Sequence, residues 1–134
     1  MCRYQNYSQI KRIGEKYYND TNFCGVVAVT AASGCSFGKA YNLCKRLGRK
    51  DRDGTPMHVS IGAMEKLGFK VTRLNYRPCK TLMMAERKLP KTGTYWLLTR
   101  NHKCHITCVK DGQMIDWATK SKKQVHCVYK VETA

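Results

Sequence analysis

A strongly apolar segment begins at Cys24. The polar residues NDTNF precede this cysteine, and GVVAVTAA follows it. The alanines favour a helix that Asn22 can cap, whereas the β-branched valines favour a strand. We predict a helix from Cys24 to about Ala32, ended by Ser33-Gly34. Because apolar residues lie on every side of this helix, we expect it to be buried.

Two amphipathic helices are expected next. Ser36 occupies the cap position of the first, and Gly48 ends it. Its apolar residues recur at helical spacing: Phe37, Ala40, Tyr41, Cys44 and Leu47. Thr55-Pro56 opens the second helix, because proline suits the first helical position, and Gly68 ends it. The apolar stripe expected on the second helix is Met57, Ile61, Met64 and Leu67.

The remainder of the chain contains mostly strand patterns. A strand is predicted from Phe69 to Leu74, and a short helix from Thr81 to Lys88. Four more strands are predicted over residues 93–100, 105–110, 113–118 and 125–132. Asp111-Gly112 predicts a tight hairpin turn between two of them. Helices followed by strands indicate one α+β domain over residues 1–134, with an antiparallel sheet.

The net charge is unusually high for this length. The chain has 25 Lys and Arg against 9 Asp and Glu, which gives +16, and the basic residues are spread from Lys11 to Lys130. Such a charge attracts polyanions. Two interpretations follow: a basic surface that keeps the protein soluble, and a docking face for nucleic acid, a ribosome or an acidic protein.

The cellular compartment is predicted from the apolar segments and the cysteines. The opening residues, MCRYQNYSQIKRIGEK, lack the apolar region of a signal peptide, and no apolar segment approaches the ~18 residues of a membrane span. We therefore expect a cytoplasmic protein that does not enter a membrane. The eight cysteines should then be reduced thiols. In a secreted protein an even number would instead suggest disulfides.

Cys24 is the candidate nucleophile. The unpaired N–H groups at a helix N-terminus stabilise a thiolate and lower the pKa of a thiol placed there. A nucleophilic cysteine also needs a nearby base, which a third group must orient. The alternative is structural, since most free cysteines pack as small apolar residues.

Two of the four histidines are candidates for the base. His105 opens a predicted strand, whereas His102 falls in the turn before it. A strand fixes a side chain better than a turn does, so we place His105 first and His102 second. His58, on an amphipathic helix, and His126, among basic residues of the last strand, are less suited.

Asp116 is the candidate for the orienting carboxylate. It lies in a predicted strand between Ile115 and Trp117, where an unpaired carboxylate would be costly. The hairpin should pair Lys110 with Gln113 and bring Asp116 beside the strand of His105. Strand alternation should place His105 on the face of Thr107 and Val109. A bond from the imidazole Nδ1–H to Asp116 would fix the tautomer of the base.

A zinc site is the alternative for the segment HKCHITC, which contains two histidines and two cysteines. Alternation places Cys104 and Cys108 on the face opposite His105. The chain contains no CxxC pair. The usual spacing of zinc ligands is therefore missing, and no metal is expected.

Taken together, Cys24 at the start of an apolar helix and the segment CHITCVKDGQMIDW resemble the papain-like cysteine peptidases. The compact bacteriocin-processing peptidase domains of exporters, and related small phage-encoded proteins, are most similar. The segment SFGKAYNLCKRLGRKDRDGTP is also similar to the phage relatives, and the resemblance covers roughly residues 19–118. It implies a papain-like fold with Cys24 as nucleophile, His105 as general base and Asp116 as orienting residue.

The chain departs from this family at one position. The family carries a glutamine about six residues before the cysteine, and its amide helps to form the oxyanion hole. Tyr18 occupies that position here. Asn19 is the nearest amide, with Asn22 and Gln9 as other candidates, and the backbone N–H of Cys24 can supply a second donor.

These patterns lead to two functional hypotheses. The first is a cysteine-dependent hydrolase of a peptide or amide bond in a protein or peptide substrate, phage-encoded, acting in the host cytoplasm and needing no cofactor. Deamidation or acyl transfer would use the same three groups. The alternative is a catalytically weak or inactive basic protein that docks on nucleic acid or on an anionic host protein.

Overall fold

The computed structural model describes residues 12, 24–49, 57–99, 106–115 and 124–134. Its helices are α2 (Cys24–Ser33), α3 (Phe37–Arg46), α4 (Met57–Lys66), the 3-10 helix η1 (Leu82–Met84) and α5 (Ala85–Lys88). Its strands are β1 (Phe69–Arg73), β2 (Thr94–Thr99), β3 (Ile106–Lys110), β4 (Gln113–Ile115) and β5 (Val125–Thr133). The predicted α+β class is confirmed.

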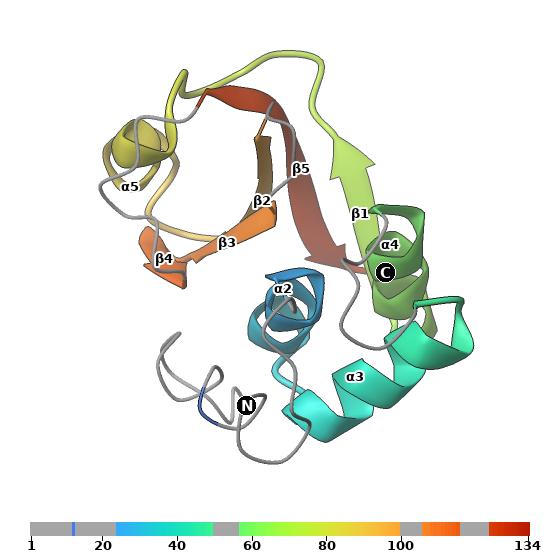
Figure 1. Ribbon diagram of the computed structural model, residues 1–134. Coiled ribbons are helices and arrows are strands. Elements are labelled where there is room, and N and C mark those ends of the chain that lie inside the picture. Colours follow the sequence, from blue (N-terminus) through green and yellow to red (C-terminus); the bar gives the residue numbers. More distant parts are fainter. Residues whose placement is uncertain (1–11, 13–23, 50–56, 100–105, 116–123) are drawn as a thin grey trace.

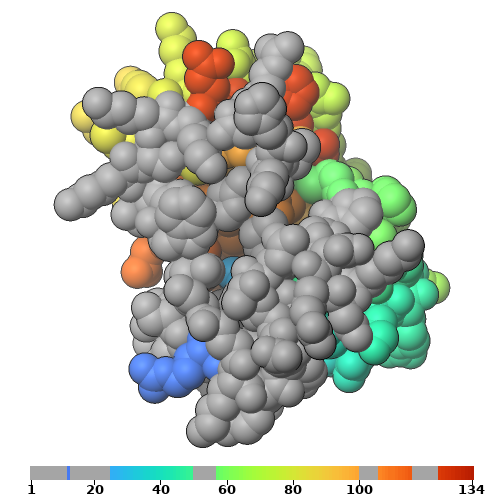
Figure 2. Space-filling view, viewed as in Figure 1, coloured from blue at the N-terminus to red at the C-terminus, as the bar shows by residue number. Residues whose placement is uncertain are grey.

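The five strands form one antiparallel sheet in the order β1-β5-β2-β3-β4. Helices α2, α3 and α4 lie on one side of this sheet, and α5 lies on the other (Figure 1). Each side encloses its own apolar cluster: Trp96, Ile106 and Cys108 pack with the α2 side, whereas Leu97, Val109 and Val128 pack with η1 and α5. In the space-filling view α3 and α4 form one flank of the molecule, and the residues around α5 form another (Figure 2).

Helix α2 is the buried element that the sequence predicts. The apolar side chains from Val26 to Ala32 are at most 5% exposed. This packing outweighs the strand preference of the valines. The hydroxyl of Thr30 donates to the carbonyl of Val26 at 2.8 Å, so its burial leaves no unpaired group. Gly34 ends the helix with a φ of 76° and donates its N–H to the Thr30 carbonyl.

The predicted limits of α3 and of the hairpin are confirmed. The hydroxyl of Ser36 accepts from the N–H of Lys39 at 3.2 Å and caps α3. Asp111 and Gly112 have φ values of 52° and 81°, as a two-residue hairpin turn requires. Lys110 pairs with Gln113, which is the predicted register. Strand β4 is described only as far as Ile115, so the rest of the strand predicted over 113–118 lies outside the described residues.

The predicted apolar stripe of α4 packs on the core, but Met64 is its only fully buried member. The buried residues are Val59, Ser60, Ala63 and Met64. The other predicted members are only half-buried: Met57, Ile61 and Leu67. Helix α4 packs against α2, α3 and β1 at once. Small side chains at Ser60 and Ala63 allow this close packing, and a search for bulky apolar residues at helical spacing does not detect them.

Within the described residues, no helix is long and apolar enough to cross a membrane.

The first prediction concerns the contact between the sheet and α2. Trp96 is fully buried, and its Nε1–H donates to the carbonyl of Ala28 at 3.2 Å. Trp96→Phe removes this hydrogen bond and leaves a cavity, so we expect the free energy of unfolding to fall by about 2–3 kcal/mol. Urea unfolding followed by circular dichroism measures the change.

Met83→Ala is the control, because Met83 is 45% exposed and should change the free energy of unfolding by no more than ~0.5 kcal/mol. A loss for Trp96→Phe that is no larger than the control would contradict the anchoring role of Trp96.

Candidate active site

The structure describes one member of the predicted catalytic set, and only its backbone. Cys24 is the first residue of α2, as predicted. His105, His102, Asp116 and Asn19 lie outside the described residues, as do the other amide candidates, Gln9 and Asn22. Their roles therefore stay predictions, and only the elements next to them in the chain can be described.

Two hydrogen bonds fix how α2 lies along the sheet. Trp96, which pairs with Cys108, donates to the carbonyl of Ala28, and the Nζ of Lys110 donates to the carbonyl of Ala31 at 3.3 Å. Cys108 thus lies level with Ala28, and Lys110, further along β3, lies level with Ala31, further along α2. The helix and β3 run in the same direction, and the start of α2 lies toward the start of β3.

This register places the backbone of Cys24 near the Ile106 end of the sheet. Cys24 precedes Ala28 by a rise of about 6 Å along the helix. Ile106 precedes Cys108 by about 6.6 Å along the strand. The two steps are almost equal in length, so the first residues of α2 and of β3 lie at the same level.

Strand β4 runs toward this same end of the sheet. Ile115 pairs with Cys108, and it is the last residue of β4. In the chain, His105 directly precedes Ile106, and Asp116 directly follows Ile115. The predicted catalytic residues thus adjoin the first residue of α2, the first described residue of β3 and the last described residue of β4.

The strand faces add a constraint on this arrangement. Ile106 and Cys108 pack with the α2 side, and Val109 packs with the η1–α5 side, so the predicted alternation is confirmed within β3. A strand that kept this alternation would carry His105 on the face of Val109, away from α2. A triad with Cys24 therefore requires the chain to leave the regular alternation between His105 and Ile106.

Most of the cysteines other than Cys24 that the structure describes are buried, and two of them have a raised pKa. Cys44, Cys79, Cys108 and Cys127 are buried, and Cys35 is half-buried. Burial raises the pKa of the Cys44 thiol to about 11, although nearby Arg49 lowers it in part. Burial also raises the pKa of Cys79. A thiol with a raised pKa stays protonated at neutral pH and reacts slowly.

Two histidines among the described residues could still serve as a base, and a metal site is the other possibility. His58 and His126 are both exposed. Among the described residues, no group of three or more His, Cys, Asp or Glu side chains could hold a metal ion. His102, Cys104 and His105 of the HKCHITC segment lie outside the described residues.

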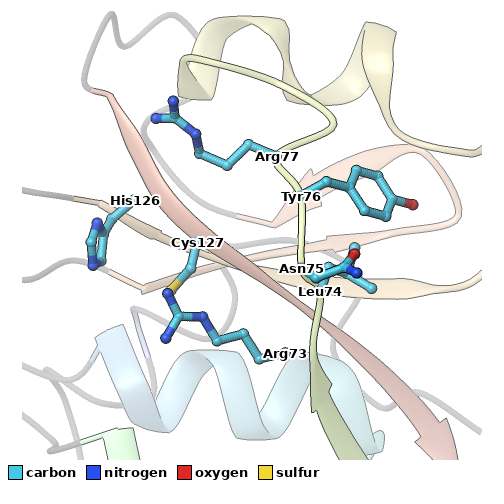
Figure 3. A pocket seen from close by; sticks show the side chains of 7 residues that line it. All are labelled: Arg73, Leu74, Asn75, Tyr76, Arg77, His126 and Cys127. Atoms are coloured by element: carbon cyan, nitrogen blue, oxygen red, sulfur yellow. The ribbon is translucent and has the colours of Figure 1, made fainter.

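Sequence reasoning missed a pocket of about 510 Å³ beside the first residues of β5. It is lined by Arg73, Leu74, Asn75, Tyr76, Arg77, His126 and Cys127 (Figure 3). These residues come from two chain segments that only the pairing of β1 with β5 brings together. The one signal in the sequence was the pair of arginines that flanks LNY.

Comparison of the chain with protein-family models, with curated proteins and with solved structures found no match.

The second prediction follows from the buried thiol of Cys44. Its pKa is about 11 in the folded protein against an ordinary value of 9.0. Folding thus favours the neutral thiol. Its contribution to the free energy of unfolding is fully present below about pH 9 and is lost as the pH rises toward 11. Between about pH 8 and pH 10.5 the wild type should lose roughly 2 kcal/mol more unfolding free energy than Cys44→Ala.

Urea unfolding of both proteins at the two pH values measures this difference, because all other titrating groups are common to both. Cys44→Ala should be less stable than the wild type at pH 8, since it leaves a cavity. Equal losses in the two proteins would contradict a raised pKa for Cys44.

Proposed function

We propose that the chain is a cysteine-dependent hydrolase with a papain-like fold that cleaves a peptide or amide bond. Cys24 is the nucleophile, His105 the general base and Asp116 the orienting carboxylate. The supporting observation is that α2 and β3 run in the same direction and that β4, paired with β3, runs back toward the start of β3. The three residues lie in or directly next to these elements in the chain, and the resemblance to small phage-encoded peptidases assigns them the same roles.

The chemistry needs no group beyond those side chains and the backbone. His105 takes the proton of the Cys24 thiol, and the thiolate sulfur attacks the carbonyl carbon of the substrate. The protonated imidazole then gives its proton to the leaving amine as the C–N bond breaks. Water activated by His105 hydrolyses the thioester and restores the thiol. The side-chain amide of Asn19 and the backbone N–H of Cys24 stabilise the oxyanion in both steps.

Within this proposal the protein is phage-encoded and acts on a protein or peptide in the host cytoplasm. The second candidate function is a basic protein that docks on nucleic acid or on an anionic host protein without cleaving it. The observation that favours this alternative is the net charge of +16. The two candidates differ in what they require of Cys24, because a docking protein has no need of a reactive thiolate.

The third prediction therefore concerns the reactivity of Cys24. Iodoacetamide should alkylate Cys24 fastest among the eight thiols, with a rate that stays high below pH 8, because the helix N-terminus and His105 stabilise the thiolate. Mass spectrometry of peptides from the labelled protein gives the rate at each cysteine. Cys24→Ala should lose this fast labelling and keep the folded circular dichroism spectrum, and Cys35→Ala should keep both.

The same measurement identifies which histidine acts as the base for Cys24 and whether Asp116 orients it. His105→Ala should slow alkylation of Cys24 at pH 6–7 by roughly tenfold or more, since it removes the imidazolium that stabilises the thiolate. His102→Ala should leave the rate nearly unchanged. Asp116→Asn should have an intermediate effect, because asparagine still accepts from Nδ1–H. Uniform, slow labelling of all cysteines would favour the docking protein, and a dominant effect of His102→Ala would show that the base is misassigned.

A further inference from the structure

The pocket beside β5 lies at the same end of the sheet as Cys24. Val125 and Cys127, near the start of β5, pair with Thr99 and Leu98 at the end of β2. Leu98 in turn pairs with Ile106, the first residue of β3. One strand, β2, therefore separates the β5 side of the pocket from the start of β3, about 10 Å at the usual spacing of strands, and Arg73 of β1 lies one strand farther.

The pocket is basic. Arg73, Arg77 and His126 line it, and none of its seven lining residues is acidic. The Nη1 of Arg77 donates to the carbonyl of Val125 at 3.1 Å, which holds this guanidinium in place and leaves its other N–H donors for a ligand. Burial raises the pKa of neighbouring Tyr129, as does its hydrogen bond to Cys127, and the positive charge of Arg73 acts in the opposite direction.

The side chains that line the pocket are better placed to bind a carboxylate than to stack on a nucleic-acid base. Arg73, Arg77 and His126 extend to the same side of the backbone, whereas the ring of Tyr76 extends to the other side (Figure 3). Tyr76 therefore provides no stacking surface beside the basic groups, and base stacking is the usual complement to charge in binding single strands. Guanidinium groups bind carboxylates through paired N–H donors. The volume of about 510 Å³ accommodates a side chain with its flanking backbone.

We propose that this pocket is a subsite for an acidic side chain of the peptide substrate, Asp or Glu, bound by Arg73 and Arg77. The proposal rests on the hydrolase function of Cys24 for the identity of the substrate. An extended peptide advances about 3.3 Å per residue, so the separation of about 10–14 Å between the pocket and the start of β3 corresponds to roughly three or four residues of substrate.

The test measures binding without turnover. The probes are the peptide acetyl-AAEAAA-amide and its counterpart acetyl-AAQAAA-amide, each titrated into the Cys24→Ala protein at about 50 mM salt. The ring resonances of His126, which lines the pocket, report occupancy by NMR. We expect the Glu peptide to bind roughly tenfold more tightly than the Gln peptide, as a charge-assisted hydrogen bond would give.

Two variants of equal net charge distinguish binding in the pocket from attraction by the overall positive charge of the protein. Arg73→Gln should abolish the preference for the Glu peptide. Arg87→Gln removes the same charge from exposed Arg87 of α5, outside the pocket, and should keep the preference. Equal binding of the two peptides, or equal losses in the two variants, would overturn the proposal. So would an oligothymidylate that binds the pocket through Arg73 when the Glu peptide does not, since the ligand would then be nucleic acid.

Failure of this proposal is distinguishable from failure of the hydrolase function. A Glu preference that depends on Arg73 would stand even if the thiolate reactivity of Cys24 were absent from the wild type. Conversely, a reactive Cys24 together with equal binding of the two peptides would overturn the subsite and leave the hydrolase in place.

Discussion

The arrangement depends on enclosing one helix that is apolar on every side. Helix α2 cannot face water along its length, so the sheet covers one side of it, and α3 and α4 pack against it as well. Apolar packing alone would let the helix slide along its axis. The polar contacts of Trp96 with Ala28 and of Lys110 with Ala31 fix its position. Lys110 also places a positive charge at the negative end of the helix dipole.

Fixing α2 along the sheet also determines where chemistry can occur. The N-terminus of the helix, with Cys24 as its first residue, lies toward the end of the sheet where the described part of β3 starts. The first residues of β5 bring the basic pocket to that same end. Burial raises the pKa of the Cys44 and Cys79 thiols, which keeps these two protonated at neutral pH. In the proposed hydrolase, the attacking thiol and the subsite for an acidic side chain would therefore lie toward one end of the sheet.

Local signals in the sequence predicted most elements because each signal depends on a few neighbouring residues. Ser36 caps α3, Asp111-Gly112 forms the hairpin, and the apolar segment after Cys24 forms α2 in spite of its valines. Features set by packing between distant segments were not predictable in this way. The buried stripe of α4 is set by several partners, the pocket by the pairing of β1 with β5, and the side of the sheet that faces α2 by the tertiary structure alone.

The central claim is that the His105 side chain reaches the thiol of Cys24, although regular alternation along β3 would place that side chain on the opposite face of the sheet. A crystal structure of the wild-type protein that shows residues 100–106 tests this most directly. The account predicts a distance of about 3–4 Å between the Cys24 Sγ and an imidazole nitrogen of His105, with the strand departing from alternation just before Ile106. A His105 side chain packed on the face of Val109, with the sheet between it and Cys24, would contradict the account.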